Sequence, residues 1–71
     1  MDIEEYKIAL AKRIKTLRLE KNMTQEELAE KMGTNHTHVV RMEKGSQDLR
    51  ISSLLKISQS FEIELGELVT L

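Results

Sequence analysis

Residues 24–45 read TQEELAEKMGTNHTHVVRMEKG, and this run predicts two short helices joined by a tight turn. Thr24 and Glu27 have the spacing of a capping box, in which each side chain bonds the backbone amide of the other residue. Gly33 is typical of a residue that ends a helix, and Asn35 is a good cap for the next one. Because only two residues separate the helices, we expect their axes to cross steeply.

Apolar residues at helical spacing continue on both sides of this run. Asn22, at the end of the first helix, tolerates the left-handed conformation that a helix C-cap often needs. Arg50 is a poor N-cap, which leaves the start of the fourth helix open. No segment has the pattern of a strand, so we predict an all-α protein with a single domain over residues 1–71. The apolar stripe of the first helix carries Ile3, Tyr6, Leu10, Ile14 and Leu17. The five helices are expected at about 3–21, 24–32, 35–44, 51–61 and 65–70.

Composition excludes several classes of protein. The chain has no cysteine, which rules out disulfides and thiolate zinc sites. His36 and His38 do not suggest a metal site either, because residues two apart on a helix point in different directions. No apolar run approaches the roughly 20 residues of a membrane span, and the first residues are acidic, unlike a signal peptide. We therefore expect a cytoplasmic protein without membrane contact.

Catalytic patterns are also missing from the sequence. It contains no nucleophile elbow and no Gly-rich phosphate loop. A helical bundle of 71 residues is also too small to enclose a sizeable pocket. We expect no enzyme activity, no cofactor, no metal and no small-molecule substrate.

Charge is unevenly distributed along the chain, although the net charge is only −1. Residues 7–21 carry six bases and one acid, and residues 41–56 sum to +2. Residues 1–6 and 57–71 each sum to −3, and residues 22–40 sum to −2. A local positive face can steer DNA even when the total charge is near zero. A solvated helix surface is the alternative interpretation of such a basic run.

The helix expected at 35–44 has an apolar side and a polar side. Val39 and Met42 point toward the core together with Glu43, whereas the opposite side carries His36, Thr37, Val40 and Arg41. These groups suit base edges in a major groove, since Arg41 can bond guanine in bidentate fashion and Thr37 or Val40 can meet a thymine methyl. A solvated charge paired with a nearby acid is the alternative for Arg41.

Phosphate contacts are expected at the helix starts and after the second helix of the pair. The backbone amides near Thr24 and Gln25 and near Asn35 and His36 point toward solvent at helix N-termini, where anions bind. Polar groups that follow the helix can hold further phosphates. They are Lys44, Ser46 and Gln47.

Apolar residues crowd the last nine positions of the chain. A short terminal helix cannot bury all of them internally, so we expect a twofold interface between two copies of the chain. Completion of the monomer core is the alternative, and it is stronger for Leu65 and Leu68. The expected interface residues are Ile63, Leu65, Leu68, Val69 and Leu71.

Two runs, MTQEELAEKMG at 23–33 and VVRMEKG at 39–45, resemble the lambda-repressor-like, Xre-type helix-turn-helix family. The similarity extends over about residues 10–69, and the loop at 46–54 is similar to that of restriction–modification controller proteins, a dimeric branch of the family. The resemblance implies a five-helix DNA-binding fold, a homodimer and a role in transcription regulation. It also implies sequence-specific binding of double-stranded DNA at a pseudo-palindromic operator.

Carried over by position, the resemblance implies roles for individual residues. Gln25 contacts a phosphate and the adjacent base, and His38 joins the residues at or near base edges, although a structural role for His38 remains the alternative. The resemblance also implies that Arg18 and Glu43 form a mostly buried ion pair, with two independent surface charges as the alternative. With the residues assigned above, the expected DNA contacts are Thr24, Gln25, Asn35, His36, Thr37, His38, Val40, Arg41, Lys44, Ser46 and Gln47.

The sequence departs from the family pattern at three positions. Asn22 stands where Gly is usual, an exchange that Asn can make conformationally. Val40 is apolar where a polar reader is common, and Arg50 stands where a cap is usual. A protein-interaction module, such as an antitoxin that binds a toxin or another regulator, is the competing functional hypothesis. The bases of the first and third helices favour DNA.

Overall fold

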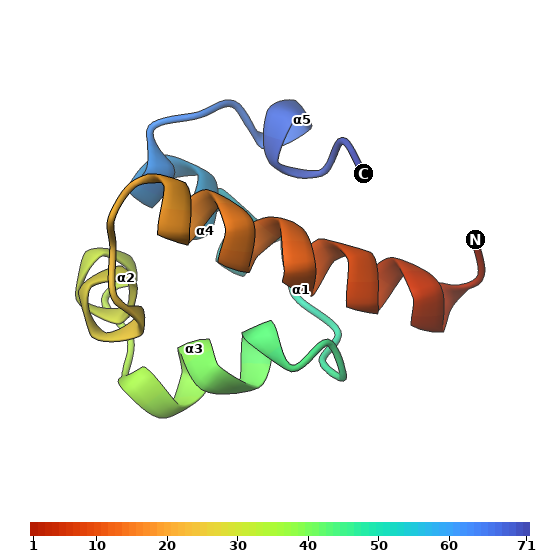
Figure 1. The fold of residues 1–71 in the computed structure, drawn as a ribbon, viewed down its shortest axis with the longest axis horizontal. Helices are drawn as coiled ribbons and strands as arrows, with labels where there is room; N and C mark the ends of the chain where they lie inside the picture. Colours follow the sequence, from red (N-terminus) through yellow and green to blue (C-terminus); the bar gives the residue numbers. More distant parts are fainter.

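Five α-helices and no strand make up the computed structural model, which describes residues 1–71 (Figure 1). The prediction of an all-α, five-helix protein is confirmed. None of these helices has the length and apolar character needed to cross a membrane. The helices are α1 Ile3–Glu20, α2 Gln25–Met32, α3 His36–Glu43, α4 Ile51–Phe61 and α5 Leu65–Leu68.

Local hydrogen bonds set both ends of α2. The Thr24 hydroxyl accepts from the backbone N–H of Glu27, and the Glu27 carboxylate accepts from that of Thr24, both at 3.0 Å. This confirms the predicted capping box. The Thr24 amide also lowers the pKa of the Glu27 carboxyl, because its hydrogen bond favours the ionised form. At the other end Gly33 adopts φ 74°, and the N–H of Thr34 bonds the carbonyl of Ala29 at 2.9 Å.

A two-residue turn separates α2 from α3. Asn35 caps α3, since its side-chain oxygen accepts from the backbone N–H of His38 at 2.9 Å. In Figure 1, α2 is seen nearly along its axis whereas α3 lies across the view, so the two helices cross steeply. The turn therefore directs α3 away from α2 and along the margin of the bundle.

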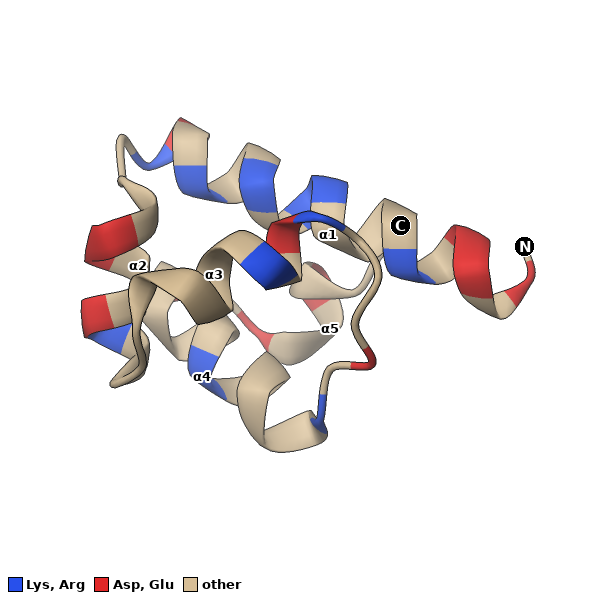
Figure 2. Ribbon diagram, turned by 90° about the horizontal axis from the view of Figure 1, so that it is seen from below, with Lys and Arg blue, Asp and Glu red and all other residues tan.

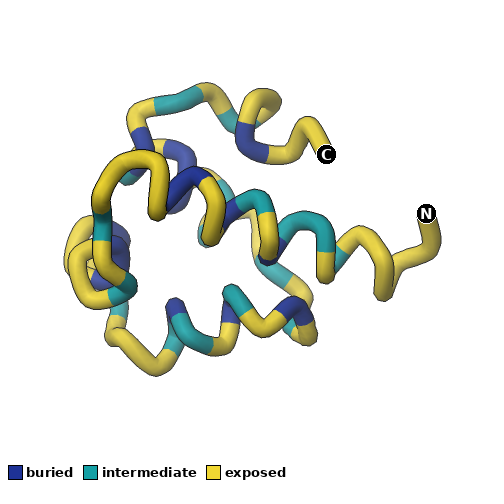
Figure 3. Tube along the Cα trace, viewed as in Figure 1, coloured by how far each residue is buried: buried dark blue, intermediate teal, exposed yellow.

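The core lies between α1, α2, α3 and α4, and α5 closes it from one end. Figure 3 shows the buried positions of each helix turned toward the centre. Val39 and Met42 of α3 are both in this core, as the sequence predicts. The cluster comprises Ile14, Leu17, Leu28, Ala29, Met32, Val39, Met42, Ile57, Phe61 and Leu68.

Leu68 lies in the core, which is the alternative that the sequence left open for it, and two residues of the predicted apolar stripe are exposed. Leu68 is 0% exposed and belongs to the monomer core, because α5 folds back on α4 and buries it, so it offers no surface to a second copy. Ile3 and Tyr6 are 71% and 51% exposed, because the first turns of α1 extend past the rest of the bundle (Figure 3). The N-terminal end of α1 thus carries uncovered apolar surface.

Gly45 determines how the chain leaves α3. Its φ is 82°, a left-handed conformation, and a Cβ at this position would lie 3.2 Å from the Cα of Ile8. Glycine therefore satisfies both the backbone conformation and the close approach to α1. The end of α3 is held against α1 as a result.

Candidate nucleic-acid interface

The outer side of α3 is open to solvent along the margin of the molecule (Figure 1). His36, Thr37 and Arg41 are exposed and Val40 is half-buried, whereas Val39 and Met42 on the opposite side are buried. The buried side of α3 packs on α1 and α2, and on the outer side only His36, which bonds Gln25, makes a side-chain hydrogen bond to α2. An exposed imidazole, hydroxyl and guanidinium therefore stand on one accessible helix surface.

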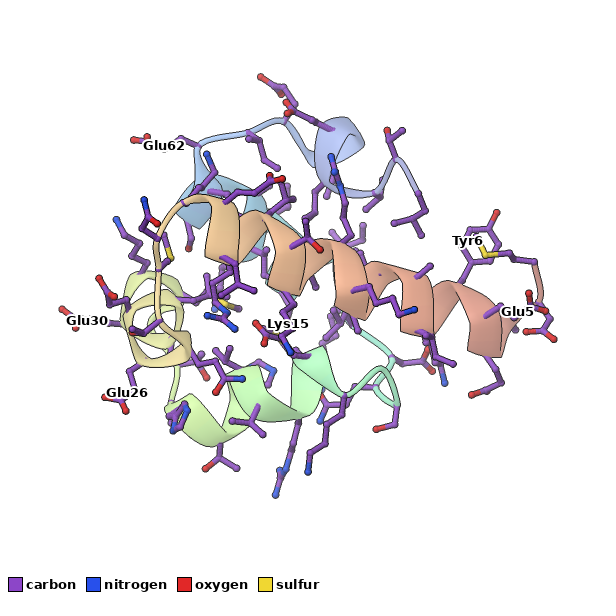
Figure 4. The ribbon with its side chains drawn as sticks, in the orientation of Figure 1. Glu5, Tyr6, Lys15, Glu26, Glu30 and Glu62 are labelled. Carbon is purple, nitrogen blue, oxygen red and sulfur yellow. The ribbon has the colours of Figure 1, made fainter.

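Three basic residues on or near this surface have no acidic partner. Arg41 and Lys44 form no ion pair, and neither does Lys15 of α1. Lys12 is also unpaired, but it lies beside Thr70 and Leu71. Figure 2 looks onto α3 and shows basic segments along α1 and near the end of α3, with acidic segments on α2 and at the start of α1. Lys15 projects from α1 on the side of α3 (Figure 4). The positive charge is therefore local, as the sequence predicts, and no acidic side chain of the protein pairs with these bases.

A buried ion pair joins α1 to the end of α3. The Arg18 Nε lies 2.7 Å from Oε2 of Glu43, and its second terminal nitrogen lies 3.0 Å from Oε1. The side chains of Arg18 and Glu43 are only 8% and 4% exposed. The remaining guanidinium nitrogen donates to the carbonyl of Met23 at 2.7 Å. One guanidinium thus connects α1, the turn before α2 and the last residue of α3.

Gln25 extends this connection to the start of α3. Its amide nitrogen donates to the Glu43 carboxylate at 3.1 Å, and its amide oxygen lies 3.1 Å from Nε2 of His36. The helix starts of α2 and α3 are therefore joined by side chains as well as by the turn. One hydrogen of the Gln25 amide has no partner within the chain and is free to donate to a phosphate.

The other sequence-predicted residues fall into two groups. The side-chain oxygens of Thr24 and Asn35 accept as caps, which leaves the Thr24 O–H and the Asn35 NH₂ group as donors for an anion beside the nearby backbone amides. His38 is half-buried, and its Nδ1 lies 3.0 Å from the Thr34 hydroxyl. Lys44 and Ser46 are exposed after α3, whereas Gln47 is half-buried between α4 and the start of α1.

A second surface lies on the side of the molecule where the two termini are, beside the N-terminal half of α1 and the segment that follows α3 (Figure 1). Val69 and Leu71 are 40% and 47% exposed, and Ile63 and Leu65 are half-buried against the core. Val69 and Leu71 line an open apolar depression of about 390 Å³. Its other apolar residues, which the sequence analysis did not assign to an interface, are Ile3, Tyr6, Leu10 and Leu49.

The sequence and the fold are both similar to those of known proteins. The helix-turn-helix family model matches residues 14–68. A relative from Archaeoglobus fulgidus, described as an uncharacterized HTH-type transcriptional regulator, is 36% identical over 56 residues, which are 79% of each chain. The restriction-modification controller protein C.AhdI from Aeromonas hydrophila superposes with a TM-score of 0.89 at 28% identity, over 96% of this chain and 99% of that one. The wild-type restriction-modification controller protein C.Esp1396I superposes with a TM-score of 0.80 at 34% identity, over 90% of this chain and 86% of that one.

Replacement of Arg18 by Ala tests the buried ion pair. We expect the free energy of unfolding in a urea titration to fall by about 3–5 kcal/mol, because the Glu43 carboxylate stays buried without its partner. Lys15→Ala, an exposed and unpaired site one turn earlier, should change it by less than about 0.5 kcal/mol. The double variant Arg18→Met, Glu43→Leu should lose less free energy of unfolding than Arg18→Ala alone, because it leaves no unpaired buried charge. An Arg18→Ala protein as stable as the Lys15→Ala control would contradict this account.

Proposed function

The chain belongs to the helix-turn-helix family of transcriptional regulators, and from this membership we propose that it binds a pseudo-palindromic DNA operator as a homodimer, with α3 of each copy in the major groove. The family is not a class of enzymes. The observation that carries the proposal is the exposed outer side of α3, flanked by bases that no acid neutralises. A major groove admits an α-helix, and its base edges offer distinct patterns of donors, acceptors and methyl groups.

Each residue of the surface has a role in this proposal. Arg41 bonds a guanine, and Thr37 and Val40 contact a thymine methyl. The backbone amides at the starts of α2 and α3 hold phosphates, with help from the free amide hydrogen of Gln25. Lys44, Ser46 and Gln47 bind the adjacent backbone, which fixes the register of α3.

The homodimer supplies the second recognition helix. Two copies joined by a twofold axis place their α3 helices in successive major grooves, about 34 Å apart on one side of the duplex. We propose that the axis passes beside the apolar depression, where exposed Val69 and Leu71 of each copy cover Ile3 and Tyr6 of the other. Uncovered apolar surface of this kind marks interaction sites.

A protein-interaction module, such as an antitoxin, is the second candidate function. The same apolar depression supports it, since an unrelated partner could cover the depression in place of a second copy. The unpaired bases of α1 and α3 favour DNA, because a purely protein-binding role leaves them without a purpose.

Selection from random duplexes followed by binding titrations tests the DNA interface. We expect a palindromic consensus and an affinity that falls steeply with salt, as counterions are released from the phosphates. Arg41→Ala should relax the preference at one base pair per half-site by about 1–3 kcal/mol. Lys44→Ala should weaken binding to all duplex sequences alike, and it should reduce the slope of log affinity against log salt concentration by about 1. Equal affinity for all duplexes, or an unchanged consensus with Arg41→Ala, would argue against α3 as the reading helix.

Sedimentation equilibrium at tens of micromolar tests the homodimer. We expect the unaltered chain to be a dimer and Leu71→Asp to be a monomer, because a carboxylate in the depression cannot be buried without a partner. Leu55→Asp is the matched control, since Leu55 is 41% exposed on α4 and does not line the depression. A monomer for the unaltered chain, or equal disruption by both substitutions, would refute the proposed interface.

A further inference from the structure

A chain of hydrogen bonds with fixed polarity runs from the core to the exposed start of α3. The Arg18 guanidinium can only donate, and the ionised Glu43 carboxylate can only accept. At 3.1 Å from that carboxylate, the Gln25 side chain must present its NH₂ group rather than its oxygen. The amide oxygen of Gln25 therefore faces His36.

The orientation of Gln25 selects the tautomer of His36. The Gln25 oxygen can only accept, so Nε2 of His36, 3.1 Å away, must carry a hydrogen. In the neutral ring the other nitrogen, Nδ1, is then bare and can only accept. No hydrogen bond of the structure engages this Nδ1, and His36 is exposed on the outer side of α3.

His38 lacks this property, although it lies on the same helix. Its Nδ1 faces the hydroxyl of Thr34 at 3.0 Å, and a hydroxyl can either donate or accept. Neither tautomer of His38 is selected by that contact. His36 is thus the one histidine of the chain whose hydrogen-bonding character is set by the fold.

We propose that His36 selects a base pair that presents an exocyclic amino group to α3, either N6 of adenine or N4 of cytosine. This inference rests on the proposed DNA-binding function and specifies the chemistry of one contact. In the major groove these amino groups are donors, whereas O6 and N7 of guanine and O4 of thymine are acceptors. A bare Nδ1 accepts from the amino group and has no hydrogen to offer a keto oxygen. Gln25 acts as a positioning residue that holds the ring in this tautomer.

Nitrogen-15 NMR of the histidine rings tests, in the free protein, whether the hydrogen bond from Gln25 sets the tautomer of His36. At about pH 8 we expect the hydrogen of His36 on Nε2 and a bare Nδ1. Gln25→Ala should shift the ring toward a mixture of tautomers, while His38 keeps its spectrum. A hydrogen on Nδ1 of His36 in the unaltered chain, or no response to Gln25→Ala, overturns the proposal.

Binding titrations test the readout at the base pair whose preference changes with His36→Ala. At that position, adenine is replaced by purine, or cytosine by 2-pyrimidinone. Each analogue lacks only the exocyclic amino group, so the analogue that weakens binding identifies the base that His36 contacts. We expect removal of the amino group to weaken binding about fivefold to tenfold for the unaltered chain and for the control Leu55→Ala on α4, and not to weaken it for His36→Ala. His36→Lys, which only donates, should reverse the preference toward guanine or thymine.

The outcomes distinguish failure of the proposed DNA-binding function from failure of the His36 contact alone. If no duplex is selected at all, the proposed function fails and the readout fails with it. If a consensus is selected but His36→Ala changes no position, or the unaltered chain prefers guanine or thymine there, the readout alone is wrong. The proposed readout by His36 is also wrong if the affinity does not change when either amino group is removed.

Discussion

The buried pair of Arg18 and Glu43 is the interaction on which the rest of the structure depends. It fixes the last residue of α3 against α1, and a third guanidinium bond holds the turn before α2. Burial of two charges is favourable only when their hydrogen bonds are satisfied, so the pair tolerates few alternative arrangements. The ion pair therefore sets the orientation of α3. Because Glu43 is fixed, the same side of α3 always faces solvent.

The two ends of α3 are constrained by different means, and together they leave the same surface free. At the start, Asn35 caps the helix and Gln25 holds His36 through a bond that begins at Glu43. At the end, Gly45 brings the chain against Ile8 of α1. A helix of eight residues, too short to be stable by itself, is in this way held in place by its neighbours. A fixed orientation suits a surface that is proposed to match a DNA groove.

Most of the local structure could be predicted because it depends on residues close together in sequence. The capping box at Thr24, the cap at Asn35 and the left-handed Asn22 all follow from pairs or single residues. Burial at the ends of the chain could not be predicted, because it depends on where distant segments lie. Periodicity alone cannot tell that α5 folds back on α4 and buries Leu68, or that α1 extends past its neighbours at Ile3. The bond between Gln25 and His36 also needs the crossing of two helices, which sequence spacing leaves undetermined.

The central claim, that the outer side of α3 reads DNA, is tested most directly by amide chemical shifts during titration with a selected duplex. The account predicts that the largest changes fall on residues 36–41 and on the starts of α2 and α3, while α5 and the free end of α1 change little. Changes concentrated on α4 and α5, with α3 unaffected by specific DNA, would contradict it.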